Sequence, residues 1–242
     1  MKIEGKNPVW ELLNSNNPVQ KLLVEQGAEN SLGGIINLAQ KKRIFVKYLP
    51  KNVMDRESEA KNHQGVIAFV EGFKYAEVEN MLKIANQKNE PPFLILCDEI
   101  ADPHNLGSLI RTAECAGAHG LIIPKNRSCQ VNSTVIKVST GSAFNLKIAC
   151  VNNLNNCIRD LKKQGVFVFA LEAGGESIYK TDLTGSIALV VGSDGFGVSA
   201  LTKKLCDGIL SLPMKGKINS LNASVAGAIG IYEAVKQRLE KW

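Results

Sequence analysis

The sequence predicts an α/β protein with a small N-terminal α/β domain and a C-terminal domain built on a mainly parallel sheet. Short apolar runs alternate with helical segments along the chain, and the runs after residue 92 are apolar throughout. Strands that are apolar on both faces are typical of parallel sheets with helices on both sides. A polar stretch ending in two prolines divides the chain. Its 242 residues suffice for two domains with separate cores.

The N-terminal domain is expected to span residues 1–75. Its predicted strands are residues 19–24, 44–48 and 66–70, and its predicted helices are residues 8–14, 30–42 and 53–61. Residues 76–91 are expected to link the domains, because a helical pattern there gives way to polar residues before Pro91 and Pro92.

The C-terminal domain is expected to span residues 92–242. Six apolar runs predict its strands, at residues 93–97, 120–123, 146–149, 166–171, 187–191 and 209–212. Ligands of such sheets bind beyond the carboxyl ends of the strands. The loops after Cys97, Val191 and Leu212 are therefore the expected site.

Composition narrows the class of protein. Apolar residues make up 45% and charged residues 21% of the chain, which is typical of soluble globular proteins. No apolar run approaches the roughly 20 residues of a membrane-spanning helix, and the first ten residues lack a signal-peptide core. We expect a cytoplasmic protein with no membrane partner. The formal charge of +6 is a mild indication of a polyanionic partner.

The six cysteines lie at irregular spacings, with no C-x-x-C pair and no neighbouring histidine ligands. We expect reduced, mostly buried thiols and no metal site.

Residues 98–113 form the first segment with candidate functional residues, a strand end followed by a turn and a helix. Asp102 and Pro103 are typical of a turn, and Asn105 is a candidate helix cap. Arg111 is then expected in the second turn of a mostly apolar helix. Its side chain either extends to solvent or pairs with a carboxylate, or it holds a phosphate with two hydrogen bonds.

Residues 190–200 form the second segment, which contains Gly192, Gly195 and Gly197. Three glycines in six residues indicate a close approach of backbone or positive φ angles. Residues 195–200 also match G-x-G-x-x-A, the pattern of nicotinamide dinucleotide sites. That alternative is disfavoured because the turn follows the fifth strand of its domain, and residues 214–217, about 20 positions later, contain no carboxylate.

Residues 213–226 form the third segment. Ser220, Asn222 and Ser224 directly precede or open a helix rich in alanine and glycine. The start of a helix attracts polar and anionic groups. Capping of this helix by Ser220 or Asn222 is the alternative explanation.

Together, the three segments resemble the motifs of the SpoU family of RNA ribose 2′-O-methyltransferases, part of the SPOUT superfamily. The resemblance covers nearly the whole chain. Residues 5–9 and 63–66 are similar to the substrate-binding domain that precedes the catalytic domain in many members. Within the family, the arrangement most resembles enzymes that methylate a guanosine ribose in 23S ribosomal RNA; a transfer RNA enzyme or a catalytically silent RNA-binding homologue are the alternatives.

The resemblance implies a trefoil-knotted α/β catalytic domain that binds S-adenosylmethionine in the knot, acts on structured RNA and forms a homodimer through the knot domain. Small residues in the last helix, Ala223, Gly227, Gly230 and Ala234, serve either that interface or packing within one subunit. The implied cofactor-binding residues are Gly192, Gly197, Leu212, Met214, Leu221 and Asn222.

The resemblance also implies roles in catalysis. Arg111 is the implied activator of the ribose hydroxyl, either as a base or by stabilising developing negative charge. Asn105 and Ser220 would orient Arg111 or the ribose, and Asn222 would support the cofactor loop. Asp194 stands where the family usually has Glu, so its carboxylate lies one methylene, about 1.5 Å, further back. Such a shift either is compensated by the nearby backbone or lowers activity.

Overall fold

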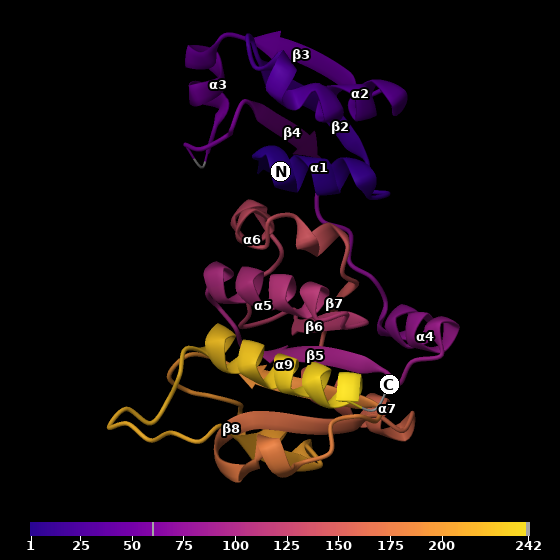
Figure 1. Cartoon of the computed structure of the whole chain (residues 1–242), viewed down its shortest axis with the longest axis vertical. Helices are drawn as coiled ribbons and strands as arrows, with labels where there is room; N and C mark the ends of the chain where they lie inside the picture. The colour runs from indigo at the N-terminus through magenta and orange to yellow at the C-terminus, as the bar shows by residue number, and fades with distance from the viewer. Residues whose placement is uncertain (60, 241–242) are drawn as a thin grey trace. The chain divides into compact units, whose positions relative to one another are not determined.

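The computed structural model describes residues 1–59 and 61–240, which form two compact units (Figure 1). The first unit comprises Met1–Lys74 and Val131–Asn145, and the second comprises Tyr75–Gln130 and the described residues from Leu146 onward. Neither unit is continuous in sequence, because a segment from the middle of the chain packs within the N-terminal unit. Gly141 permits this packing, since a Cβ there would lie only 2.8 Å from the Cβ of Glu11.

The first unit contains a four-stranded sheet in the order β1-β4-β2-β3. Its strands are β1 (Lys2–Glu4), β2 (Val19–Glu25), β3 (Phe45–Leu49) and β4 (Val66–Val70). Its helices are α1 (Lys6–Asn14), α2 (Gly33–Lys41), α3 (Lys51–Glu57) and α6 (Ser133–Val138), with short 3-10 turns at Glu29–Leu32 and Ser142–Phe144. The three predicted strands are present; β1 was missed because three residues carry too little alternation to identify a strand.

Helices pack on both faces of this sheet, α3 on the first face and α1 and α2 on the other. Met54 of α3 packs against Leu23 and Ile67 on one face. The alternate residues of the same strands, including Leu22 and Ala68, are fully buried on the opposite face, where α1 and α2 pack.

The second unit contains a six-stranded sheet in the order β10-β8-β9-β5-β6-β7, and every neighbouring pair is parallel. The predicted α/β class with a mainly parallel sheet is confirmed. The strands are β5 (Phe93–Asp98), β6 (Gly120–Pro124), β7 (Ile148–Val151), β8 (Phe167–Ser177), β9 (Ile187–Gly192) and β10 (Gly208–Ser211). Every residue of the central strands β5 and β9 is buried, as their apolar sequences predict.

The helices of the second unit are α4 (Val78–Lys88), α5 (Pro103–Cys115), α7 (Leu154–Lys163), α8 (Ala200–Leu205) and α9 (Ala223–Glu240). The predicted linker 76–91 therefore contains the whole of helix α4. No helix among the described residues is both long and apolar enough to cross a membrane.

Helix α9 packs closely against other elements of the same chain. It lies beside α5 (Figure 1), and a Cβ on Gly227 would lie 2.5 Å from the side chain of Leu109. A Cβ on Gly230 would lie 2.6 Å from the side chain of Leu171 at β8. The glycines therefore bring α9 close to α5 and to the sheet, which supports packing within one subunit as their role.

The cysteines are free, as predicted, but only Cys97 is buried; Cys115 is exposed and the other four are half-buried. The expectation of mostly buried thiols is wrong, since only one of the six is buried. Cys115 is exposed because it lies in the last turn of α5, away from the buried face of that helix. Burial raises the pKa of the Cys97, Cys157 and Cys206 thiols to about 12.

This difference predicts selective alkylation. A thiol with a pKa near 12 is a thiolate in only about one molecule in 10⁴ at pH 8, so Cys97, Cys157 and Cys206 should resist iodoacetamide. Cys115 should react first in the folded protein, as measured by peptide mass spectrometry, and Cys115→Ser should remove the fast phase. Modification of Cys206 as fast as Cys115 would contradict the raised pKa of the Cys206 thiol.

Candidate active site

A cavity of about 330 Å³ lies at the carboxyl ends of three neighbouring parallel strands, β8, β9 and β10. The segment before α9 and the start of α9 complete it. Its position agrees with the predicted site after Val191 and Leu212, and its volume is in the range of small-molecule sites. The lining residues are Leu171–Ala173, Val191–Gly197, Leu210, Leu212, Met214, Asn219–Leu221, Ala223 and Ala226.

The glycine-rich segment forms a tight turn at one wall of this cavity. Ser193 and Gly197 exchange backbone hydrogen bonds of 3.2 and 2.9 Å, and Gly195 and Gly197 have φ angles of +83° and +65°. A Cβ on Gly192 would overlap the backbone of Gly197 and Val198. Close approach and positive φ thus account for these glycines.

The carboxylate of Asp194, at the tip of this turn, joins three segments that are distant in sequence. It accepts hydrogen bonds from Nδ2 of Asn105 in α5, from Nδ2 of Asn222 (3.1 Å) and from the backbone N–H of Ala223 (2.7 Å). Nδ2 of Asn222 also lies 2.9 Å from Oδ1 of Asn105. The carboxylate is held at the N-terminus of α9, where the helix dipole favours negative charge.

Asn222 has two roles at this junction. Its Oδ1 accepts hydrogen bonds from the N–H groups of Ser224 (3.1 Å) and Val225 (3.3 Å), and so caps α9, while its amide nitrogen faces Asp194. Capping, the alternative explanation, is therefore correct for Asn222 but does not exclude a role in the site.

Asn105 does not cap α5, which corrects the prediction. The carboxylate of Asp102 caps the helix, accepting from the N–H groups of His104 (3.2 Å) and Asn105 (3.3 Å). The cap moves to Asp102 because Pro103 occupies the first helical position, for which its fixed φ suits it. The Asn105 side chain is thereby free to contact Asp194, and it is buried in doing so.

Arg111 is exposed and lies in the third turn of α5 rather than the second, because the helix begins at Pro103. It is not among the residues that line the cavity, and within the described chain its guanidinium has no hydrogen bond or ion pair. The structure brings together Asn105, Asp194 and Asn222, and it places Ser220 in the cavity wall, but it leaves Arg111 apart.

Most of the predicted cofactor residues meet at the cavity. Gly192, Gly197, Leu212, Met214 and Leu221 line it, and Asn222 adjoins it through Ala223.

Glu172 is a cavity residue that the sequence did not single out. It is half-buried at the end of the parallel part of β8, accepts a 2.9 Å hydrogen bond from the Val198 N–H, and lies 3.6 Å from Lys203. A Cβ on Gly197 would overlap its carboxylate. Its position directly after a predicted strand was the only available signal.

Comparison with known proteins agrees with this geometry. Residues 92–232 match the model of the SpoU rRNA methylase family, and residues 2–76 match the model for RNA 2′-O ribose methyltransferase substrate binding. The chain is 41% identical to YacO of Bacillus subtilis (strain 168), named for the TrmH family of tRNA/rRNA methyltransferases, over 97% of this chain and 94% of that one.

A second relative is the 23S rRNA (guanosine-2′-O-)-methyltransferase RlmB of Xanthomonas campestris pv. campestris, 38% identical over 98% of this chain and 96% of that one.

Solved structures show the same fold. The SpoU methyltransferase AviRb of Streptomyces viridochromogenes, crystallised with the cofactor AdoMet, aligns with a TM-score of 0.83 at 24% identity, over 99% of this chain and 90% of that one. The TrmH/SpoU tRNA modifying enzyme of A. aeolicus aligns with a TM-score of 0.57 at 28% identity, over 67% of this chain and 85% of that one. From its matched domains, its relatives and its fold, this chain belongs to the SpoU family of RNA methyltransferases.

Proposed function

We propose that this protein methylates the 2′-hydroxyl of a guanosine ribose in 23S ribosomal RNA, with S-adenosylmethionine as the methyl donor. The observation that carries the proposal is that the second and third sequence segments line one cavity, and that Asp194 ties the first segment to it. The RlmB relative supports the choice of substrate.

The cavity fits S-adenosylmethionine, which supplies a methyl group activated by a positively charged sulfonium. Among the described residues, the charged side chains that line the cavity are two carboxylates, Glu172 and Asp194, which suits a cationic ligand. Apolar side chains such as Leu171, Val191 and Leu212 offer walls for a purine ring. The AviRb complex with AdoMet supports the same assignment.

Each group of residues has a role in this proposal. Asp194, Asn105 and Asn222 fix the turn and the start of α9, while Leu212, Met214 and Leu221 enclose the cofactor, together with the backbone at Gly192 and Gly197. Ser220 lies in the wall, where its hydroxyl can meet the ribose or orient Arg111.

Arg111 is proposed to act across a homodimer. Its guanidinium carries a permanent positive charge and can grip an RNA phosphate while it stabilises negative charge on the attacking oxygen. Because Arg111 does not line the cavity of its own chain, we propose that two subunits share each substrate site. Exposed apolar side chains on α9, namely Val225, Tyr232 and Leu239, support such an interface.

The direct test is methyl transfer from labelled S-adenosylmethionine to 23S ribosomal RNA and to transfer RNA, followed by mapping of ribose methyls. A single 2′-O-methylguanosine in 23S RNA is expected. Label in transfer RNA alone would show that transfer RNA, not 23S RNA, is the substrate, as for the tRNA modifying enzyme of A. aeolicus. Cofactor binding without label in either RNA would reject the activity and favour a silent RNA-binding protein.

Arg111→Ala should lower the transfer rate by about 100-fold or more, since it removes the charge at the reacting oxygen. S-adenosylmethionine affinity, measured by calorimetry, should change less than about twofold, because the proposed contacts of Arg111 are with the RNA phosphate and ribose rather than with the cofactor. Arg111→Lys is the matched control: it keeps the charge but loses the planar fork, so it should retain part of the rate. Normal turnover by Arg111→Ala would refute this role.

Asp194→Glu should slow the enzyme, although it restores the residue common in the family. Asp194 already meets donors from Asn105, Asn222 and Ala223, so an added methylene of about 1.5 Å pushes the carboxylate beyond them. Asp194→Asn is the control that removes the charge at constant length, and it should destabilise the fold by about 1–3 kcal/mol. A faster Asp194→Glu enzyme would show instead that the short side chain limits the reaction.

Glu172→Gln should weaken binding of S-adenosylmethionine by about tenfold and of S-adenosylhomocysteine much less, because only the former carries the sulfonium charge. Glutamine can still accept the Val198 N–H bond. Lys203→Met controls for the lost ion pair. Equal losses for the two ligands in calorimetry would show that Glu172 does not act through charge.

A further inference from the structure

One face of the sheet in the first unit carries aromatic and basic residues in alternation. Lys21 of β2 pairs laterally with Phe45 of β3 on one side and with Phe69 of β4 on the other. Phe69 in turn pairs with Lys2 of β1. Laterally paired residues point to the same face of a sheet. Phe45, Lys21, Phe69 and Lys2 therefore form a continuous row across all four strands, here called the aromatic–lysine row.

The two phenylalanines of this row have different environments. The ammonium groups of Lys21 and Lys2 lie 4.4 and 5.6 Å from the centre of the Phe69 ring, in cation–π geometry, and Phe69 is half-buried. Phe45, on the edge strand, is 64% exposed. Lys47, two residues further along β3, is exposed on the same face. An open aromatic ring thus lies between two exposed lysines, Lys21 and Lys47.

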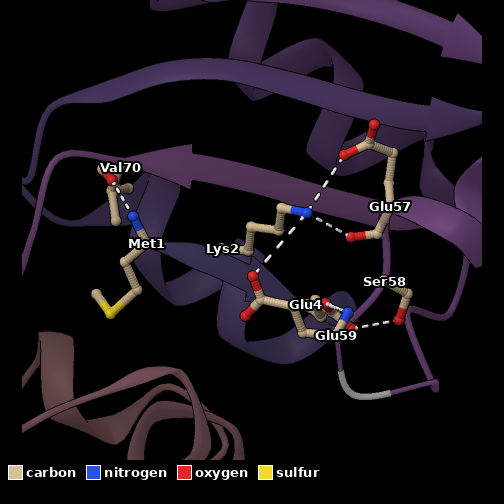
Figure 2. A network of polar contacts seen from close by, with 7 residues as sticks. All are labelled: Met1, Lys2, Glu4, Glu57, Ser58, Glu59 and Val70. Carbon is tan, nitrogen blue, oxygen red and sulfur yellow. Dashed lines mark hydrogen bonds and ion pairs between the residues drawn. The ribbon is translucent and has the colours of Figure 1, made fainter.

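The row stays open because α3 covers only the neighbouring part of the face, at Leu23 and Ile67. The chain that leaves α3 is fixed against β1 (Figure 2). Nζ of Lys2 lies 2.7 Å from the backbone oxygen of Glu57, and the carboxylate of Glu4 accepts hydrogen bonds of 2.7 Å from the Ser58 hydroxyl and the Glu59 N–H.

Charge also differs along the row. Lys2 forms ion pairs with Glu57 (3.3 Å) and Glu59 (3.9 Å), so its charge is largely compensated. Within the described chain, Lys21 and Lys47 have no acidic partner. The two lysines without an acidic partner are therefore the sheet neighbours of Phe45: Lys21 is its lateral partner on β2, and Lys47 lies two residues along β3.

We propose that the aromatic–lysine row binds a single-stranded segment of the RNA substrate, with a base stacked on Phe45 and phosphates near Lys21 and Lys47. The proposal rests on the proposed function in that RNA is the substrate. Stacking of unpaired bases on aromatic rings of a sheet, with lysines along the backbone, is a general mode of single-strand recognition. A protein partner fits less well, since lysine is depleted at the centre of protein interfaces.

Fluorescence anisotropy on the full-length protein tests this, with a labelled single-stranded RNA of about 12 nucleotides and a duplex of the same sequence. Phe45→Ala should weaken single-strand binding by about tenfold and leave duplex binding unchanged, since loss of one stacked base costs about 1–3 kcal/mol. Phe167→Ala is the matched control, because Phe167 is 59% exposed in the second unit. It should change affinity less than about twofold.

Lysine and phenylalanine should differ in their response to salt. Lys21→Ala should reduce the slope of log K against log salt concentration by about 0.7, the value for one phosphate contact on a single strand. Phe45→Ala should leave the slope unchanged. Phe45→Trp keeps a stacking surface and should retain the affinity for single-stranded RNA, so it tests the proposal even if the alanine variant folds poorly.

Wild-type affinity in Phe45→Ala, or no single-strand binding by the wild type, would overturn the proposal. A change in self-association alone, measured by sedimentation, would also overturn it and assign the face to a second copy. Titration with S-adenosylmethionine separates this proposal from the proposed function: Phe45→Ala should bind the cofactor normally. A wild type that binds RNA through Phe45 but not the cofactor would reject the proposed function alone.

Discussion

The carboxylate of Asp194 is the contact on which the candidate site depends. It is bonded to Asn105 from α5, to Asn222 and to the first N–H of α9, which lie 89, 28 and 29 residues away along the chain. Each of the three polar segments has an ordinary explanation by itself, as a cap or a turn. Their hydrogen bonds to a single carboxylate make them one structure, and the cavity lies beside it.

Glycine residues, which have no side chain, let the surrounding elements pack closely enough for this contact to form. Gly192 and Gly197 allow the turn to fold back on itself and leave room for Glu172, while Gly227 and Gly230 let α9 approach α5 and the sheet. The start of α9 is thereby brought to the carboxyl ends of the central strands, where parallel sheets bind ligands. The close packing at the glycines and the hydrogen bonds to Asp194 thus both position the start of α9 at the cavity.

Much of this structure could be predicted from the sequence, because apolar periodicity identifies strands buried in a parallel sheet. The local sequence pattern gave wrong or incomplete predictions where the position of a residue depends on contacts with residues distant in sequence. It assigned Asn105 as a cap, since it could not show that the side chain turns toward Asp194. It gave no sign that residues 131–145 pack in the first unit, or that Glu172 lines the cavity. The aromatic–lysine row likewise depends on strand order, which periodicity alone does not reveal.

The most direct measurement is a double-mutant cycle between Asn105 and Asp194, with Asn105→Ala, Asp194→Ala and the double variant compared by urea denaturation. If Asp194 joins α5 to the glycine turn as described, the two changes should be coupled by about 1 kcal/mol or more in the free energy of unfolding. Additive effects, within about 0.3 kcal/mol, would contradict the account, because the two side chains would then act independently.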